Sequence, residues 1–408
     1  MENRKNAGGA RGAFPAVALC AAGAEKALSN ELKGMGIAVA EPGFGRVSFR
    51  ADVGGLYLAL MGLRTADRVL LEAGRFRAAD FDALFDGALR VPWERFVPAG
   101  LGAGIDRVRS SRSKLRAETS IQSVTHKAVA QRLCRAHSLS RLPQTDDSAR
   151  IRVHIDRDEV SLLLDLSGEP LFRRGYRKKG GTAPLRETTA AAMLLLSGWK
   201  RKYPLHDPFC GSGTILAEAL MYAWDMAPNL GRGFAIGSLL IGDRGVEEKA
   251  RRELCARIDL GRRVRISGSD ADEGAARLAM ETILAVKSLA ESVGGGEVPR
   301  ESVPQILTAR AEDARPVFPA ERNDARPSDD PLGFVVTNPP YGKRLGDREE
   351  ARETYARMSG LAAGFGGWKL AAISDEPGFE SFFGRKADSC RGITCGADPA
   401  FLFQYARL

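Results

Sequence analysis

Four consecutive residues, Asn338-Pro339-Pro340-Tyr341, are of the types needed to hold a planar amine. The amide oxygen of Asn338 and a carbonyl of one of the two prolines would place two acceptors on one stiff turn, because proline fixes its own φ and restricts the residue before it. Two acceptors on the hydrogens of an exocyclic NH2 of a base would return electron density to the nitrogen and fix its direction of attack. The ring of Tyr341 would stack on the face of that base.

The residues before this turn predict the element that positions it. Val335 and Val336 are typical of a strand buried on both faces, and the strand should end at Asn338 because proline cannot continue a sheet ladder. Open α/β sheets bind ligands at the carboxyl ends of their strands. The alternative is an ordinary turn between a strand and a loop, and the wider sequence decides between the two interpretations.

A second segment, Leu205 to Leu216, has the pattern of a strand, a glycine turn and a helix. Gly211 and Gly213 allow the backbone to approach a ligand closely, and Thr214 begins an apolar helix whose N-terminus points at the turn. The third glycine and the lysine of nucleotide-binding loops are missing. The acidic residue before the turn, Asp207, suits a ligand with a cationic amino group.

A further strand is predicted over residues 264–272, and its tip carries two acids, Asp270 and Asp272. An acid at such a tip can bind both hydroxyls of a ribose, and Asp270 is the candidate for that role. Asp272 suits the N-cap of the helix that follows, which is the alternative role for an acid at this place.

The order of these motifs resembles that of the S-adenosylmethionine-dependent methyltransferases that modify exocyclic amines of nucleobases. Asp-Pro-Phe-Cys-Gly-Ser-Gly-Thr begins at Asp207, and Thr-Asn-Pro-Pro-Tyr-Gly begins downstream at Thr337. Together with Leu-Phe-Arg-Arg-Gly-Tyr-Arg from Leu171, they make the chain similar, from Phe14 onward, to the THUMP-domain RNA methyltransferases. Within that family, the resemblance is greatest to the bacterial enzymes that make N2-methylguanine in large-subunit ribosomal RNA.

The resemblance implies S-adenosylmethionine as the cofactor and S-adenosylhomocysteine as the product. The segment around Leu185 would lie over the methionine part of the cofactor, and Asp313 would bind its adenine amine, although Asp313 could equally be an acid of a loop. The implied cofactor-binding residues are Leu185, Glu187, Asp207, Pro208, Phe209, Gly211, Gly213, Thr214, Asp270, Asp313 and Asn338. The implied catalytic residues are Asn338, Pro339, Pro340 and Tyr341. No metal and no strong base are expected, because the nitrogen becomes acidic once methylated and loses its proton to solvent.

A chain of 408 residues with a net charge of +9 predicts two or three domains and a polyanionic partner. The net charge alone is also compatible with a basic protein that does not bind nucleic acid. None of the six cysteines forms a Cys-x-x-Cys pair, so neither a zinc site nor a disulfide framework is indicated. No apolar run is long enough to span a membrane, and we expect reduced thiols in a cytoplasmic protein.

The expected fold is α/β, with a Rossmann-like class I methyltransferase domain preceded by small α+β modules. The alternation of strands with helices from Leu205 onward predicts a mostly parallel sheet, seven-stranded by the resemblance. The resemblance also supplies the ferredoxin-like and THUMP assignments. The expected divisions are a disordered basic tail (1–12), a ferredoxin-like module (13–67), a THUMP RNA-binding domain (68–168), a basic linker (169–184) and the methyltransferase domain (185–408).

Three basic segments are candidates for contact with RNA. The first lies in the expected THUMP domain, the second surrounds Tyr176 in the linker, and the third follows the Asn-Pro-Pro-Tyr turn. The first could be only a solvated loop, and the second only a charged linker. The candidate residues are Arg107, Arg109, Arg112, Lys114, Arg116, Arg173, Arg174, Arg177, Lys178, Lys179, Lys343 and Arg344.

The predicted activity is methyl transfer to the exocyclic N2 of a guanine in large-subunit ribosomal RNA, after extrusion of the base from its helix or loop. Three alternatives stay open. The same chemistry could act on transfer RNA, Asn-Pro-Pro-Tyr also occurs in enzymes that methylate adenine N6 of DNA, and the chain could be a non-catalytic RNA-binding assembly factor. Loss of residues 14–166 should not affect an enzyme that acts on DNA, and Asn338→Ala should not affect an assembly factor.

Overall fold

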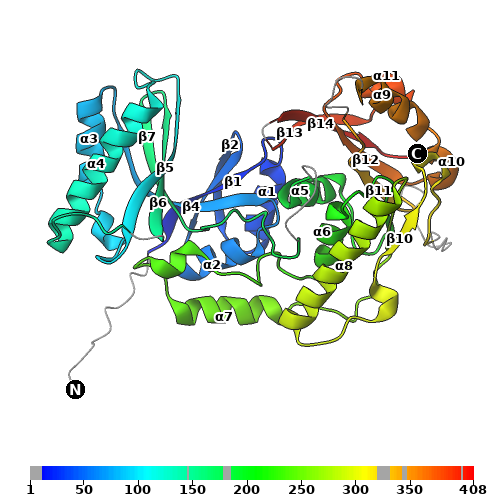
Figure 1. Ribbon diagram of the computed structural model, residues 1–408, viewed down its shortest axis with the longest axis horizontal. Helices are drawn as coiled ribbons and strands as arrows, with labels where there is room; N and C mark the ends of the chain where they lie inside the picture. The colour runs from blue at the N-terminus through cyan, green and yellow to red at the C-terminus, as the bar shows by residue number, and fades with distance from the viewer. Residues whose placement is uncertain (1–11, 145–146, 178–184, 319–330, 342–346, 397) are drawn as a thin grey trace.

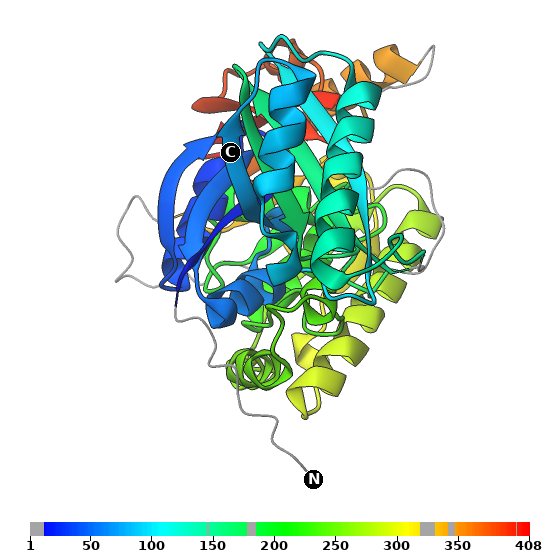
Figure 2. The ribbon, with the colours of Figure 1, turned by 90° about the vertical axis from the view of Figure 1, so that its left-hand side faces the viewer.

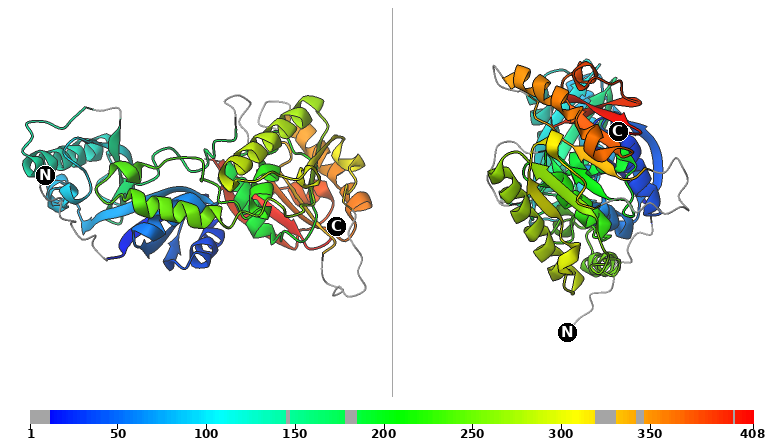
Figure 3. Two further views of the ribbon diagram at one scale, coloured as in Figure 1. Left: turned by 90° about the horizontal axis from the view of Figure 1, so that it is seen from below. Right: turned by 90° about the vertical axis from the view of Figure 1, so that its right-hand side faces the viewer.

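The computed structural model describes residues 12–144, 147–177, 185–318, 331–341, 347–396 and 398–408, which form two seven-stranded sheets placed side by side along the long axis (Figures 1 and 3). Residues 1–11 of the predicted tail lie outside the described residues, as do Lys178, Lys179, Lys343 and Arg344. Within the described ranges, no helix combines the length and the apolar composition needed to cross a membrane.

The first sheet has the strand order β2-β3-β1-β4-β7-β6-β5, and helices α3 and α4 cover one of its faces near β5 (Figure 2). Its strands are β1 (Phe14–Cys20), β2 (Ala38–Gly43), β3 (Arg46–Ala51), β4 (Ala66–Arg77), β5 (Gly102–Ser111), β6 (Ser148–Asp156) and β7 (Glu159–Asp165). Its helices are α1 (Glu25–Gly34), α2 (Val53–Gly62), α3 (Phe81–Arg90), η1 (Trp93–Arg95) and α4 (Glu118–His137). Strand β4 pairs with β1 on one side and with β7 on the other, so the segments on either side of the expected boundary at residue 67 share one continuous sheet.

The first basic segment is partly a strand, which corrects the loop interpretation for Arg107 and Arg109. Both side chains are exposed on β5, the edge strand of the sheet, and Arg112, Lys114 and Arg116 are exposed just after it. An edge strand with a solvated face needs few apolar residues, so its pattern in the sequence is weak.

The second sheet has the strand order β10-β9-β8-β11-β12-β14-β13. The first five strands are parallel and β14 is antiparallel to β12 and β13, so the sheet is mixed but mostly parallel, as predicted. Its strands are β8 (Leu205–Asp207), β9 (Ile266–Asp270), β10 (Gln305–Thr308), β11 (Phe334–Thr337), β12 (Lys369–Ser374), β13 (Ser389–Cys395) and β14 (Asp398–Tyr405). Strand β13 was not predicted, because Ile393 is its only fully buried residue.

Helices cover both faces of this sheet. Phe334 and Val336 of β11 belong to a core shared with α5, α6 and α8, whereas Val335 belongs to a separate cluster with α9, α10 and α11. The helices are α5 (Glu187–Ser197), α6 (Thr214–Ala223), η2 (Ala235–Ser238), α7 (Arg244–Cys255), α8 (Glu273–Gly294), η3 (Arg300–Ser302), η4 (Ala311–Asp313), α9 (Asp347–Met358), α10 (Leu361–Phe365) and α11 (Phe379–Phe383). The prediction that β11 is buried on both faces is confirmed.

A buried arginine joins the two sheets. Arg174, in the segment between them, donates from Nε to a carboxylate oxygen of Glu218 on α6 (3.3 Å). Its other nitrogens donate to the carbonyls of Leu171 (2.8 Å) and of Arg64, just after α2 (2.5 Å). Tyr176 donates from its hydroxyl to the same Glu218 carboxylate (3.2 Å). The side chains of Arg174 and Glu218 have no exposed surface, so the prediction that Arg174 contacts RNA is wrong.

Replacement of Arg174 by alanine should lower the free energy of unfolding by about 3–5 kcal/mol, because the Glu218 carboxylate would stay buried without its partner. The matched control is Arg173→Ala, which removes a neighbouring side chain that is 65% exposed and pairs with Glu169. That change should alter the free energy by less than about 0.5 kcal/mol. Urea denaturation measures both effects, and equal stability of the two variants would show that the buried pair does not stabilise the junction.

Candidate active site

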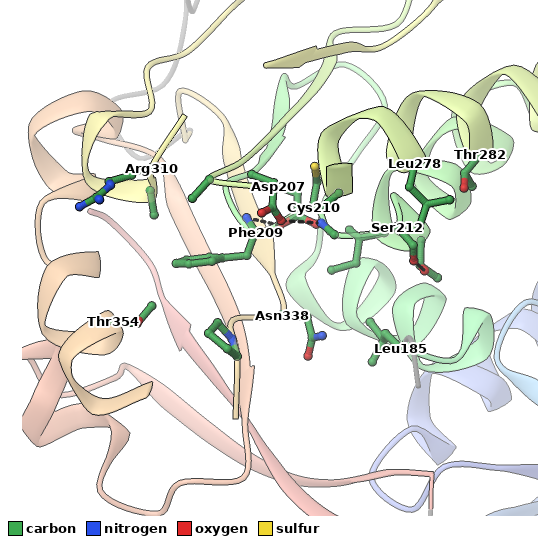
Figure 4. Close-up of a pocket in the computed structure, with 18 of the residues that line it drawn as sticks. Leu185, Asp207, Phe209, Cys210, Ser212, Leu278, Thr282, Arg310, Asn338 and Thr354 are labelled. Carbon is green, nitrogen blue, oxygen red and sulfur yellow. Dashed lines mark hydrogen bonds between the residues drawn. The ribbon is translucent and has the colours of Figure 1, made fainter. Parts of the chain in front are cut away.

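A cavity of about 960 Å³ opens at the carboxyl ends of β8, β9 and β11 (Figure 4). It is lined by the glycine turn after β8, the tip of β9, the turn at Asn338 and residues of α8 and α9. In Figure 4, Arg310 and Thr354 lie on one side of the cavity, and Ser212 and Thr282 lie on the other. The volume is near the upper end of the range of about 300–1,000 Å³ that is typical of ligand pockets.

Two glycines in the left-handed region shape the turn between β8 and α6. Gly211 has a φ of +50°, and a Cβ added there would meet no atom within 4 Å, so the space over its backbone is open to a ligand. Gly213 has a φ of +76°, and an added Cβ would lie 3.0 Å from the Cα of Ala279 on α8. The first glycine therefore lines the cavity, while the second allows α6 and α8 to pack closely.

The two acids at the tip of β9 have separate roles. Asp270 lines the cavity, and its carboxylate accepts from the backbone N–H groups of Gly211 (2.9 Å) and Asp272 (3.0 Å). Asp272 accepts from the N–H groups of Gly274 (2.6 Å) and Ala275 (3.3 Å), and so caps α8. The backbone thus holds the Asp270 carboxylate in place, and each of its oxygens keeps a lone pair for a ligand hydroxyl.

Asp207 ends β8 in the wall of the cavity and is only 1% exposed. Its Oδ1 accepts from the hydroxyl of Thr337 (2.7 Å) and the backbone N–H of Phe209 (3.1 Å). The pKa of this carboxyl is raised to about 7, chiefly by burial; the two hydrogen bonds oppose the rise, and the nearby Asp270 contributes to it. A carboxyl with a strongly raised pKa in a cavity wall is typical of a functional site.

The turn at Asn338 carries two acceptors that are already hydrogen-bonded within the protein. Tyr341 donates from its hydroxyl to Asn338 Oδ1 (2.5 Å), and Tyr355 of α9 donates to the carbonyl of Pro340 (2.8 Å). Asn338 and Pro340 line the cavity, whereas the Tyr341 ring packs against the main core. The aromatic residues of the cavity wall are Phe209 (Figure 4) and Tyr176. The structure therefore places Tyr341 as a support for Asn338 rather than as a stacking surface.

The segment after the buried arginine completes the wall beside α6. Arg177 donates from Nη2 to the hydroxyl of Thr214 (2.5 Å), and its Nε lies 3.5 Å from a carboxylate oxygen of Glu187. Arg177, Thr214 and Leu185 line the cavity. Glu187 lies behind Arg177, where burial raises its pKa and Arg177 lowers it. Arg177, which was expected to contact RNA, is thus part of the cavity wall.

Most of the expected cofactor-binding residues converge on the cavity: Leu185, Asp207, Phe209, Gly211, Thr214, Asp270 and Asn338. Glu187, Pro208, Gly213 and Asp313 do not line it, and neither do Pro339 and Tyr341 of the expected catalytic set. The structure corrects the prediction that Asp313 binds the cofactor, because Asp313 is exposed at the end of η4 while its neighbour Glu312 lines the cavity. Successive residues of a 3₁₀-helix point about 120° apart, so the sequence does not reveal which of two adjacent acids faces inward.

Sequence reasoning missed the contributions of α8 and α9. The lining residues from these helices are Ala275, Leu278, Glu281, Thr282, Ala285, Glu350, Glu353, Thr354 and Arg357. Nothing in the local pattern distinguishes them from other partly exposed positions of a helix. Cys210 and Ser212 also line the cavity, and their place inside the glycine turn is a signal that could have identified them.

The exposed basic candidates for RNA contact lie on the first sheet and in the segment between the sheets. Arg112 Nη2 lies 2.7 Å from Asp156 Oδ2, and Arg173 forms an ion pair with Glu169. These pairs leave most of both arginine side chains exposed, so contact with RNA stays a prediction for them.

Comparisons with known proteins agree with this geometry. A family model described as RMKL-like, methyltransferase domain, matches residues 174–284 and 311–397, and a model of the RlmL ferredoxin-like domain matches residues 16–70. The chain is 28% identical to the putative RNA methyltransferase YpsC of Bacillus subtilis over 96% of each protein. It is 34% identical to the ribosomal RNA large subunit methyltransferase K/L of Syntrophotalea carbinolica over 92% of this chain and 51% of that protein. The chain thus spans about half the length of the K/L relatives that it matches.

A solved structure has the same fold throughout. The structure of SMU.472, described as a putative methyltransferase complexed with SAH, matches with a TM-score of 0.83 and 30% identity, covering 97% of this chain and 98% of that one. The residues of the cavity wall fit S-adenosylmethionine, since Asp270 suits ribose hydroxyls, Asp207 suits an amino group and Phe209 suits an adenine face. The chain therefore belongs to the RMKL-like methyltransferase family, and it is a class I methyltransferase that uses S-adenosylmethionine.

Proposed function

We propose that this protein methylates the exocyclic N2 of a guanine in RNA, and that the RNA is large-subunit ribosomal RNA. The observation that carries the proposal is that the acceptor groups at the end of β11 share a cavity with Asp207 and Asp270. The names of the K/L relatives and of YpsC support RNA as the class of substrate. A location in the cytoplasm, where that RNA is found in bacteria, is part of the same proposal.

The cavity walls have the groups needed to hold the cofactor. S-adenosylmethionine supplies, when bound, a methyl group on a positively charged sulfur. Asp270 would accept from the ribose hydroxyls, and the ionised carboxylate of Asp207 would stabilise a nearby positive charge. Arg177 and Thr214 close the side of the cavity next to α6 and so help to exclude water.

Asn338 provides the first acceptor for the guanine amine. Its Oδ1 has two lone pairs, of which Tyr341 uses one. The second acceptor would be the carbonyl of Pro339 or of Pro340; Pro340 lines the cavity, and its carbonyl keeps a second lone pair beside the bond from Tyr355. Two acceptors orient the nitrogen lone pair and increase its electron density, so positioning and electrostatics would supply the rate enhancement without a strong base.

The first sheet would hold the RNA by its backbone. The exposed residues Arg107, Arg109, Arg112, Lys114 and Arg116 lie there, apart from the cavity. Contacts of this kind fix the position of an RNA without reading its sequence. The guanine would then leave its helix or loop to enter the cavity, which costs a few kcal/mol.

Asn338→Ala should lower the rate of methyl transfer by about 10²-fold or more, because one of the two preorganised acceptors is lost. The assay offers labelled S-adenosylmethionine with protein-free large-subunit ribosomal RNA, bulk transfer RNA or duplex DNA, and digests the products to nucleosides. The matched control is Asn30→Ala, at an exposed asparagine of α1, which should leave the rate unchanged.

We expect labelled N2-methylguanosine from ribosomal RNA with the original protein and with Asn30→Ala, and none with Asn338→Ala. The same nucleoside from transfer RNA would support the proposed reaction but identify transfer RNA as the substrate. N6-methyladenine from DNA would contradict the assignment of the base, and full activity of Asn338→Ala would contradict the assignment of the residue.

Substitution of Arg107 and Arg109 by alanine should weaken RNA binding and reduce its dependence on salt. Each lost phosphate contact should reduce the slope of log affinity against log salt concentration by about 0.7–0.9. Titration of RNA at several salt concentrations measures this slope. Arg244→Ala is the control, since its side chain is 92% exposed on α7. An unchanged slope in the double variant would exclude β5 from the RNA interface.

Binding of S-adenosylmethionine at pH 6.5 should release a proton from Asp207. Burial raises the pKa of this carboxyl from 3.8 to about 7, so most of it is protonated in the free protein, and a cation beside it favours ionisation. Because the folded-state pKa is the higher one, this group makes the free protein less stable as the pH rises from about 4 to about 7.

Calorimetry in buffers with different heats of ionisation counts the released protons. Asp207→Asn should abolish the release, while Asp313→Asn, at an exposed acid outside the cavity, should keep it. Equal proton release in all three proteins would show that Asp207 does not respond to the cofactor.

A further inference from the structure

A second cavity, of about 570 Å³, lies where α1 meets α5 and the end of α6 (Figure 1). Thr214 at the start of α6 lines the candidate active site, whereas Tyr222 near the end of α6 lines the second cavity. Eight residues of an α-helix span about 12 Å. Among the residues that the structure describes, none lines both cavities, so the second cavity is a separate feature of the junction between the sheets.

The wall of the second cavity carries an excess of positive charge. Five of its side chains are basic and two are acidic. The basic residues come from α1, β13 and the segments that follow α2, α5 and α7, which are far apart in the sequence. The basic residues are Lys26, Arg64, Arg201, Arg257 and Arg391, and the acidic residues are Glu31 and Asp225. A hollow lined by charges of one sign concentrates ligands of the opposite sign.

Both acids already have partners within the protein. Glu31 accepts from the backbone N–H of Arg64 (2.7 Å). Asp225 is shared by two arginines, since its Oδ1 lies 3.1 Å from Nη2 of Arg201 and its Oδ2 lies 3.7 Å from Nε of Arg257. One carboxylate balances the charge of only one arginine, so the wall keeps positive charge that the protein itself does not neutralise.

Arg64 is the most buried of the five basic residues, at 8% exposure. Its Nη2 donates to the carbonyl of Met226 (2.6 Å), but its Nη1 is buried and has no hydrogen-bond partner in the described part of the chain. Burial lowers the pKa of this guanidinium, and Glu218 and Glu31 offset only part of that effect. A buried charged donor without an acceptor is costly, and an anion in the cavity would provide the acceptor.

The ring of Tyr222 brings a second arginine close to Arg64. The guanidinium carbons of Arg64 and Arg201 lie 5.4 Å and 5.0 Å from the centre of that ring. The ring attracts both cations but carries no net charge, so both remain available to an anion. Forked guanidinium groups match the oxygens of a phosphate better than the point charge of a lysine does.

We propose that the second cavity binds a phosphate group, with Arg64 as its buried donor and Arg257 and Arg391 as exposed donors at its opening. Its volume is that of a small-molecule site, and such sites are common between domains. The phosphate could belong to a small molecule or to the backbone of RNA, since the chemistry of recognition is the same. The cavity is separate from the candidate active site, so the inference does not rest on the proposed function.

Inorganic pyrophosphate is the probe, and calorimetric titration of the full chain measures its affinity. Arg257→Ala combined with Arg391→Ala should weaken binding by about 10²-fold, because two charged hydrogen-bond donors are lost. The matched control combines Arg244→Ala with Arg252→Ala, which removes the same charge at two exposed positions of α7 outside the cavity. Equal affinities of the two double variants would overturn the proposal, and so would a failure of the original protein to bind pyrophosphate at millimolar concentrations.

Arg64→Lys tests the unpaired donor. Lysine keeps the positive charge but lacks the second nitrogen of the fork, so the affinity for pyrophosphate should fall about tenfold. Thermal unfolding without ligand checks that the variant is folded, and pyrophosphate should raise its midpoint less than it raises that of the original protein. An unchanged affinity in folded Arg64→Lys would contradict the role of Arg64.

Competition with RNA identifies the source of the phosphate. RNA is titrated at constant ionic strength onto protein with and without saturating pyrophosphate. Weaker RNA binding in the presence of pyrophosphate, with no such change in the Arg257 and Arg391 double variant, would assign the cavity to the RNA backbone. Equal RNA affinity with and without pyrophosphate would assign it to a small phosphorylated molecule. Neither titration involves methyl transfer, so failure of the proposed reaction and failure of this site are distinguishable.

Discussion

Arg174 and Glu218 lie without exposed surface at the junction of the two sheets, and either charge alone would cost several kcal/mol to bury. The pair is satisfied only when three parts of the chain meet there. Arg64 provides a carbonyl from the first sheet, Tyr176 a hydroxyl from the connecting segment, and Glu218 a carboxylate from α6. Any arrangement that separated these parts would leave a buried charge without its partner.

The same junction fixes part of the cavity. Helix α6 carries Glu218 in its middle and begins at Thr214, which lines the cavity. Arg177 lies three residues after Arg174, and its bond to Thr214 completes that wall. In another part of the wall, Thr337 of β11 donates to Asp207 of β8, which joins the strand before the turn at Asn338 to the strand before the glycine turn. The cavity and the turn at Asn338 are therefore held as one unit by bonds between neighbouring strand ends.

The sequence predicted the parts of this unit whose residues are adjacent in the chain. The glycine turn, the acid at Asp270 and the strand that stops at the prolines all have local signals that reflect backbone conformation. Arg174 shows where such reasoning fails, because an arginine among basic residues looks solvated until its partner, 44 positions away, is known. The edge strands β5 and β13 were not predicted for a different reason, because a strand with one solvent-exposed face has few apolar residues to form a pattern. Which of Glu312 and Asp313 faces the cavity depends on the phase of a single helical turn, which no periodicity in the sequence reveals.

The central claim is that the acceptors at Asn338 act on the exocyclic amine of a guanine. The most direct test is methyl transfer to ribosomal RNA in which inosine replaces guanosine, because inosine lacks only that amine. RNA with 7-deazaguanosine, which retains the amine, serves as the control for altered base chemistry. The account predicts methylation of the control and none of the inosine RNA. Methylation of the inosine RNA at the rate of the control would contradict the account, because the amine could then not be the acceptor of the methyl group.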